Sequence, residues 1–167
     1  MTDPESAREG FHENPLSLMA SRNPPNPQNL DFKYVTDVEE ARQVVAFLLT
    51  EPAIGLDIET TGLDARRDAI VSIGLVPFDL QRIRCRDAFY EVVKPNTPLS
   101  EESITFHRIT HSDIRQAPPM AAVLDRVLKA MAGKIMVVHY RAIERAFLDR
   151  AVQQHLGESL TFPVIDT

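Results

Sequence analysis

Apolar residues recur three and four positions apart in three segments of the chain, the spacing that gathers them on one face of a helix. The first segment starts at Thr36 or Asp37, either of which can cap a helix, and stops before Glu51. The second covers residues 120–131 after a pair of prolines, and the third covers 140–156; a glycine closes each of these two. The pattern therefore predicts three helices.

Shorter apolar runs, rich in β-branched and aromatic residues, predict strands between these helices. The runs cover residues 54–58, 69–78, 87–93, 134–139 and 162–165. The polar stretch 79–86 can join the second and third strands as an antiparallel connection, while 100–110 is mixed in character. Three antiparallel strands followed by helix, strand, helix and strand predict an α/β domain with a mixed sheet flanked by helices.

The N-terminal part of the chain differs from the rest in composition. Residues 1–33 hold five of the twelve prolines and show no apolar period. We therefore expect 1–33 to be a disordered, proline-rich extension and the folded domain to cover 34–167.

Composition and charge narrow the classes of function. The net charge of −6 argues against a broad electrostatic footprint for duplex nucleic acid, although metal ions can supply local positive charge in a nuclease. Arginines at 66, 67, 141 and 145 are local basic spots or simply solvated side chains. No stretch approaches the ~20 apolar residues of a membrane span, no signal peptide is visible, and Cys85 is alone, so we expect a cytoplasmic protein without membrane partners.

Two carboxylates, Asp57 and Glu59, interrupt the apolar run 54–58 at its end. Alternate residues of a strand share a face, so the two side chains project together while Leu56 and Ile58 face the other way. Such a pair repels unless a cation lies between the two carboxylates, and oxygen ligands suit Mg²⁺ or Mn²⁺. The alternative is a solvated acidic strand end, but the apolar flanks and the turn signal that follows favour a metal site.

Residues 57–64, Asp-Ile-Glu-Thr-Thr-Gly-Leu-Asp, resemble the first motif of the DnaQ-like 3′–5′ exonucleases of the DEDD superfamily. Residues 139–148 resemble the second motif, His-Asn-Ala-x-Phe-Asp-x-x-Phe-Leu, with the same spacing. Glu144 stands where that family has a metal-associated Asp, and Tyr140 and Arg141 depart from its Asn and Ala. On the residues alone, Glu144 can also be a solvated helix residue, and His139 either a core histidine or a substrate contact.

A third match is Phe106-His107-Arg-Ile-Thr110, similar to the His-Gly-Ile-Thr of proofreading exonucleases. His107 either lines the nucleotide pocket or has a structural role. The His-x4-Asp motif that ends the family's DEDDh branch is missing, because no histidine in this sequence has Asp five residues later. The resemblance thus implies an RNase H-like domain that is C-terminally incomplete within 34–167.

The resemblance also implies a function and a set of roles. It predicts a metal-dependent 3′–5′ exonuclease, similar to the proofreading subunit of DNA polymerase III, that releases nucleoside monophosphates, with DNA favoured over RNA. Two Mg²⁺ or Mn²⁺ ions would be held by Asp57, Glu59 and Glu144. The terminal nucleotide would contact Thr60, Thr61, Leu63, His107 and His139.

The expected partners are single-stranded 3′ ends and a polymerase or another replication or repair protein. Without the last motif, the 167-residue chain is expected to be weak or inactive. Two alternatives remain open. One is a catalytically impaired module that binds nucleic acid or protein; the other is a structural domain whose carboxylates bind nothing.

Overall fold

The structure is a computed structural model that describes residues 38, 42, 45–46, 48–49 and 52–167. The predicted extension 1–33 lies outside the described residues, as does most of the first predicted helix. The six described residues between 38 and 49 are all helical.

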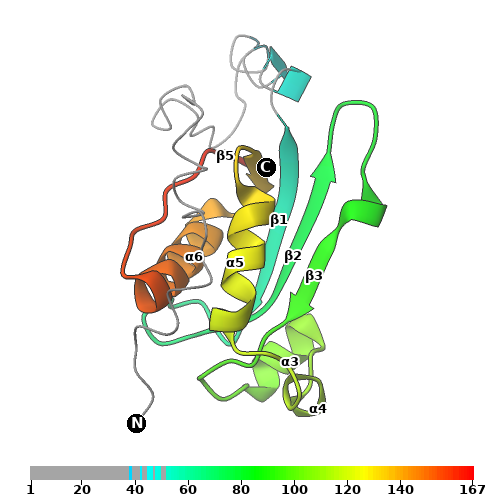
Figure 1. The fold of residues 1–167 in the computed structure, drawn as a ribbon. Helices are drawn as coiled ribbons and strands as arrows, with labels where there is room; N and C mark the ends of the chain where they lie inside the picture. Colours follow the sequence, from blue (N-terminus) through cyan, green and yellow to red (C-terminus); the bar gives the residue numbers. More distant parts are fainter. Residues whose placement is uncertain (1–37, 39–41, 43–44, 47, 50–51) are drawn as a thin grey trace.

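A mixed five-stranded sheet forms the centre of the domain, with strand order β3-β2-β1-β4-β5 (Figure 1). The strands are β1 Ala53–Thr60, β2 Ile70–Phe78, β3 Phe89–Val92, β4 Ile135–Val138 and β5 Val164–Asp166. β1, β2 and β3 pair antiparallel, whereas β1, β4 and β5 run parallel. This is the mixed sheet that the order of elements predicted.

β1 is longer than the pattern of apolar residues indicates, because β2 pairs with it as far as Thr60. Glu59 therefore lies inside the strand, opposite Ser72, and the turn begins at Thr61. The register shifts between Glu59 and Thr60, and the residue left over on β2 is Val71, which makes a β-bulge.

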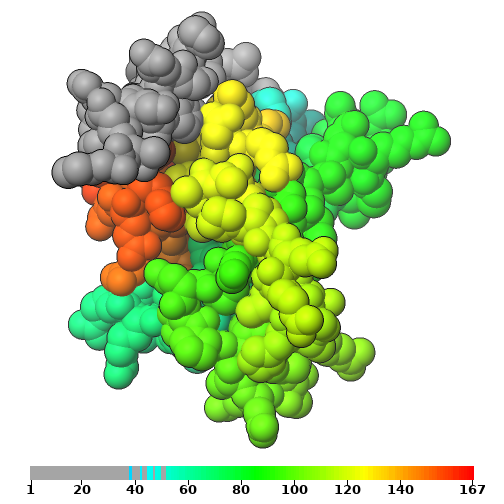
Figure 2. Space-filling model, turned by 60° about the horizontal axis from the view of Figure 1, so that its bottom comes forward, coloured from blue at the N-terminus to red at the C-terminus, as the bar shows by residue number. Residues whose placement is uncertain are grey.

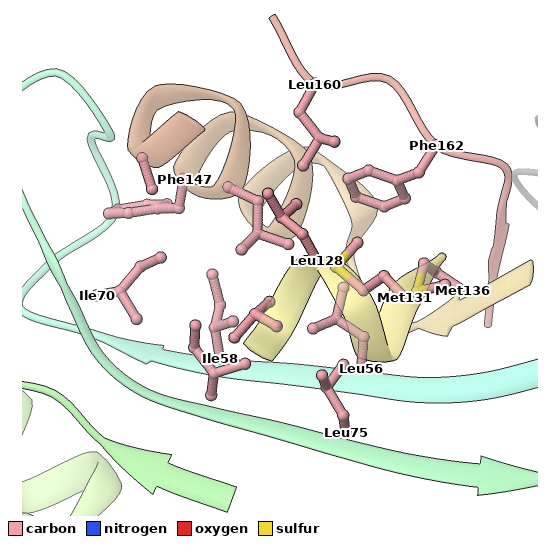
Figure 3. Packing of buried hydrophobic residues seen from close by; sticks show 14 of the residues in the cluster. Leu56, Ile58, Ile70, Leu75, Leu128, Met131, Met136, Phe147, Leu160 and Phe162 are labelled. Atoms are coloured by element: carbon pink, nitrogen blue, oxygen red, sulfur yellow. The ribbon is translucent and has the colours of Figure 1, made fainter. Parts of the chain in front are cut away.

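Two long helices, α5 Met120–Met131 and α6 Arg141–Leu156, cover one face of the sheet (Figure 1). Both match the predicted helices to within a residue. The main core lies between these helices and the sheet, where Leu56 and Ile58 of β1 meet Leu128 and Met131 of α5 (Figure 3). Leu128 and Met131 are fully buried.

The segment without a clear period contains two short helices, α3 Glu101–His107 and α4 His111–Ile114. Each depends on a cap for its backbone donors. The Ser100 hydroxyl accepts from the Ser103 N–H, and Thr110 forms a capping box with Asp113. A 3-10 turn, η2 Cys85–Asp87, lies in the polar connection before β3.

The opposite face of the sheet carries two small apolar clusters with β1 between them. One joins Val71, Leu99 and Ile109 near α3 and α4. The other joins Ile135 and Ile165 with Leu48. Among the described helices, none is long and apolar enough to span a membrane.

Candidate active site

Alternation along β1 separates the two carboxylates from the core. Leu56 and Ile58 are buried under α5 and α6, while Asp57 is exposed and Glu59 half-buried on the opposite face. Gly74 lies opposite Asp57, so the neighbouring strand adds no side chain beside this carboxylate. The predicted side-by-side projection of Asp57 and Glu59 is confirmed by this register.

The parallel register brings the start of α6 to the level of Asp57. Gly55 of β1 pairs with Val137 of β4, so the chain leaves β4 beside the following residues of β1. Two residues separate the end of β4 from the start of α6, which carries Glu144 in its first turn. Asp57 and Glu144, which are 87 residues apart in sequence, therefore supply carboxylates to one place.

Glu144 is buried inside this cluster of carboxylates. Its side chain is 3% exposed, and its Oε2 atom has no hydrogen-bond partner among the described residues. Burial raises the pKa of Glu144 to about 7; Asp57 and Asp166 raise it further, whereas a backbone hydrogen bond and His139 lower it. The burial excludes the alternative that Glu144 is a solvated helix residue.

Glu59 is also partly buried beside another carboxylate. Burial raises its pKa, and the charge of Asp57 adds to the increase. This is the repulsion that the sequence predicted for two carboxylates on one strand face.

Asp166, which the sequence analysis did not single out, fixes the start of α6. Its Oδ1 accepts from the backbone N–H of Tyr140 at 2.8 Å and of Arg141 at 3.3 Å. Its Oδ2 lies 3.9 Å from Nε of Arg141. An acidic residue at the end of a buried parallel strand was the signal that could have found it.

Two further contacts join the end of β4 to Thr167, the residue after β5. Nδ1 of His139 lies 2.8 Å from the carbonyl oxygen of Thr167, and the Thr167 N–H donates to the Val138 carbonyl at 3.0 Å. His139 itself is exposed, so the alternative of a core histidine is excluded. Tyr140 has a left-handed backbone with φ 77°, a conformation in which Asn is favoured over bulky residues.

The loop after β1 is fixed by Asp68. Its Oδ1 accepts from the Thr61 hydroxyl at 3.2 Å, and its Oδ2 accepts from the Asp64 N–H at 2.9 Å. A Cβ at Gly62 would lie 2.5 Å from this carboxylate, so a larger residue would displace Asp68 from these hydrogen bonds. The Thr61 N–H also donates to the Ala69 carbonyl at 2.9 Å, which engages the polar donors of Thr61 within the loop.

The remaining predicted substrate contacts differ in how exposed they are and in whether their polar atoms already form hydrogen bonds. Leu63 is 80% exposed at the tip of the loop, and Thr60 donates its hydroxyl to the Gly62 carbonyl. His107 ends α3, and its Nδ1 accepts from the Ile109 N–H at 3.0 Å. Burial lowers the pKa of His107. Because Nδ1 is already engaged, the ring offers a ligand only its Nε2 atom, which is buried and has no partner among the described residues.

Asp57 and Asp166 are near enough to Glu144 to raise its pKa, but the carboxylates do not point at a common centre that could bind a metal ion. Within the described residues, no group of three or more His, Cys, Asp or Glu side chains is arranged so that it could hold a metal ion.

Comparison with known proteins places this geometry in a family. The family model described as exonuclease (RNase T) matches residues 54–167. The PolC-type DNA polymerase III of Oceanobacillus iheyensis is 31% identical over 120 residues, which cover 72% of this chain and 8% of that protein. The PolC-type enzyme of Thermotoga maritima is 30% identical over 112 residues, covering 67% of this chain and 8% of its own. The chain thus spans about 8% of the length of these relatives.

Solved structures agree with this assignment. Exonuclease X in complex with 5′ overhanging duplex DNA is 25% identical with a TM-score of 0.50, covering 57% of this chain and 53% of that one. E. coli exonuclease I in complex with a dA16 oligonucleotide shares the fold, with a TM-score of 0.57 at 12% identity over 64% of this chain and 24% of that one. The RNase H-like fold is thereby confirmed. The chain belongs to the exonuclease family.

Proposed function

We propose that this domain removes nucleotides from the 3′ ends of nucleic acid by metal-dependent phosphodiester hydrolysis and releases nucleoside monophosphates. The observation that carries the proposal is the buried Glu144, whose pKa of about 7 reflects burial and the nearby Asp57 and Asp166. Carboxylates are gathered in this way where a cation balances them.

The residues fit a divalent cation. Asp57, Glu59 and Glu144 offer only oxygen ligands, the donor type that Mg²⁺ and Mn²⁺ prefer. The Oε2 atom of Glu144 is buried without a partner among the described residues, a cost that a bound cation would remove. Because no ready-made group of ligands exists in the described part of the chain, side-chain rotation at Asp57 and Glu59 would complete the site.

Each residue then has a defined role. Asp57 and Glu59 would hold two cations from β1, and Glu144 would help to hold the second from α6. The chemistry that such cations would supply is a bound water of lowered pKa and neutralisation of charge on the scissile phosphate. Leu63 packs against the terminal base, with Thr60 beside it, while Thr61 keeps the loop in place. His139 and the free nitrogen of His107 contact the nucleotide.

DNA is the proposed substrate, with single-stranded 3′ ends as the form bound. The solved structure of exonuclease X contains duplex DNA with an overhang, and the relatives in the sequence comparison are DNA polymerases. The matching segment of those relatives is part of a much longer polymerase chain, which supports a polymerase or another replication protein as partner. The net charge of −6 predicts weak, salt-sensitive binding in the absence of metal.

The direct test is digestion of a single-stranded oligonucleotide in the presence of Mn²⁺. A 3′ label should appear at once as mononucleotide, whereas a 5′ label should pass through a ladder of shortened products. Asp57→Asn and a chelator should both abolish digestion. Release of the 5′ label first would contradict the proposed direction.

A second candidate is a catalytically impaired binding module. Glu144 in place of the family's Asp favours it, as does the lack of a ready-made ligand group among the described residues. Glu144→Asp separates the two functions. An exonuclease tuned to Glu should lose turnover on this change, whereas an impaired module should gain turnover or keep none, with oligonucleotide binding unchanged.

We further propose that the 167-residue chain, which contains no His-x4-Asp, digests DNA weakly by itself. A general base typically contributes ~10²–10⁴-fold to the rate. Ordinary exonuclease rates from purified 1–167 that are abolished by Asp57→Ala would contradict this expectation.

A further inference from the structure

A cavity of about 180 Å³ lies on the side of the sheet covered by α5 and α6, away from Asp57 and Glu59. Its walls come from the loop around Arg67, the loop 94–97, the start of α5 and the second half of α6. In Figure 2 these segments, coloured blue-green, green, yellow and orange to red, surround a hollow. The cavity belongs to no part of the site proposed above.

Cationic side chains converge on this cavity from three segments. Arg67, Lys94 and Arg150 all line it beside the ring of His155, in a chain whose net charge is −6. In the part of the chain that the structure describes, none of Lys94, Arg150 and His155 forms an ion pair. The charges of Lys94 and Arg150 are therefore available to a ligand.

The two acidic neighbours leave most of this charge in place. Asp68 lines the cavity, but its carboxylate is hydrogen-bonded to Thr61 and to the Asp64 N–H within the loop. Asp64 pairs with Arg67 at 3.0 Å, which neutralises only one of the three cationic side chains. The lining keeps an excess of positive charge.

The start of α5 adds donors to the same cavity. Pro119 and Met120 line it, and this 12-residue helix begins without a side-chain cap and without an acidic residue in its first turn. The Ala122 N–H donates to the Pro119 carbonyl at 3.0 Å, but the positive end of the helix dipole still favours an anion at such a position. The cationic side chains and the helix end thus point to one ligand class.

The floor of the cavity is apolar. Ile70, Met120, Phe147 and Ala151 line it below the cationic rim. A ligand with a phosphate and an apolar, flat part matches both surfaces.

We propose that this cavity binds a phosphate group, carried either by a nucleic acid strand or by a free nucleotide. Arg150 and His155 lie roughly 9 and 16 Å beyond Glu144 along the axis of α6, so the phosphate site is separate from the carboxylates. The proposal does not rest on the nuclease activity, because phosphate binding here needs no metal.

The test is calorimetric titration of the whole 167-residue chain with inorganic phosphate, in low salt and with a chelator present. Lys94→Gln and Arg150→Gln should each weaken binding about tenfold, since each removes a charge-assisted hydrogen bond. Lys94→Arg should keep most of the affinity. Lys129→Gln is the matched control, because Lys129 is a cation of α5 that pairs with Asp125 and lies outside the cavity.

Two further titrations identify the source of the phosphate. Competition by a single-stranded oligonucleotide indicates a strand, whereas competition by deoxyadenosine monophosphate alone indicates a free nucleotide. All titrations are repeated with Asp57→Asn, so that loss of catalysis and loss of phosphate binding are observed separately. No phosphate binding, or equal binding by Arg150→Gln and the parent at unchanged melting temperature, would overturn the proposal.

Discussion

At the scale of single residues, Glu144 is unusual because a carboxyl group lies in the interior of the domain. It is 3% exposed, and its pKa of about 7 is well above the ordinary 4.5. Without metal, the folded protein therefore keeps a proton on Glu144 at pH values where the unfolded chain has lost it. The folded state then binds more protons than the unfolded state, so stability decreases as pH rises between these two pKa values.

The metal-free chain is thus expected to lose stability from about pH 4.5 to pH 7, by at most about 3 kcal/mol from Glu144. Glu144→Gln should remove this part of the slope, because the amide does not titrate. Urea unfolding at several pH values, with a chelator present, measures the difference between parent and variant. A parallel slope in both proteins would show that Glu144 titrates normally.

Tyr140 is a second residue whose own conformation makes a prediction. Its left-handed backbone costs a bulky residue roughly 1–2 kcal/mol, and its side chain is 63% exposed. Tyr140→Asn should therefore stabilise the chain by up to about 1 kcal/mol. Tyr90 is equally exposed but lies in β3, so Tyr90→Asn is the control and should destabilise. Chemical unfolding of both variants distinguishes relief of backbone strain from a general effect of replacing tyrosine.

At the scale of elements, the parallel strands β4 and β5 control where α6 begins. Asp166 at the end of β5 accepts from the N–H groups at the start of α6, and Glu144 is in the first turn of that helix. The carboxylate of Asp166 is thus a helix cap supplied by a neighbouring strand. It acts on the site through the position of Glu144.

Asp166→Ala should lower stability by about 1 kcal/mol and weaken stabilisation by Mn²⁺, because the start of α6 loses its acceptor. Asp166→Asn keeps one oxygen acceptor and should restore most of both. Asp113→Ala is the matched control, since Asp113 caps only the short α4. It should lower the melting temperature without changing the response to Mn²⁺. An equal loss of Mn²⁺ response in both variants would show that Asp166 stabilises the fold in general and does not position Glu144.

The same elements show what the sequence could and could not predict. α5, α6 and β2 were predicted to within a residue, because a strong apolar period records burial directly. α3 and α4 were not resolved, since four- and seven-residue helices depend on their caps and on packing near Val71 rather than on a period. Asp166 was missed because its partners are backbone groups 25 and 26 residues away.

At the scale of the whole molecule, the sheet separates two kinds of surface. One face packs under α5 and α6 and makes the main core, whereas the other exposes Asp57 between two small apolar clusters. A cation bound by Asp57 of β1 and Glu144 of α6 would link these two elements. Metal binding should therefore be visible in the global stability of the chain.

Mn²⁺ should raise the melting temperature of the parent chain in proportion to the logarithm of its concentration above the dissociation constant. Asp57→Asn should remove this increase, while leaving the metal-free stability unchanged or raising it, because a repulsive pair is relieved. Thermal unfolding with and without chelator measures both effects. If Mn²⁺ stabilises the variant as well as the parent, the ion binds elsewhere.

The bulge at Val71 has a consequence for how far the sequence around the site can change length. Before it, Ile70 faces the main core; after it, Ser72 and Gly74 face the two carboxylates. Val71 therefore acts as a phase shift of one residue between two halves of β2. A variant that lost residue 71 would pair Ile70 and Ser72 in ordinary alternation, so its cost would be the loss of Val71 from the cluster with Leu99 and Ile109. Length changes in the loop 61–69 have a different cost, because the Asp68 carboxylate binds both the Thr61 hydroxyl and the Asp64 N–H there.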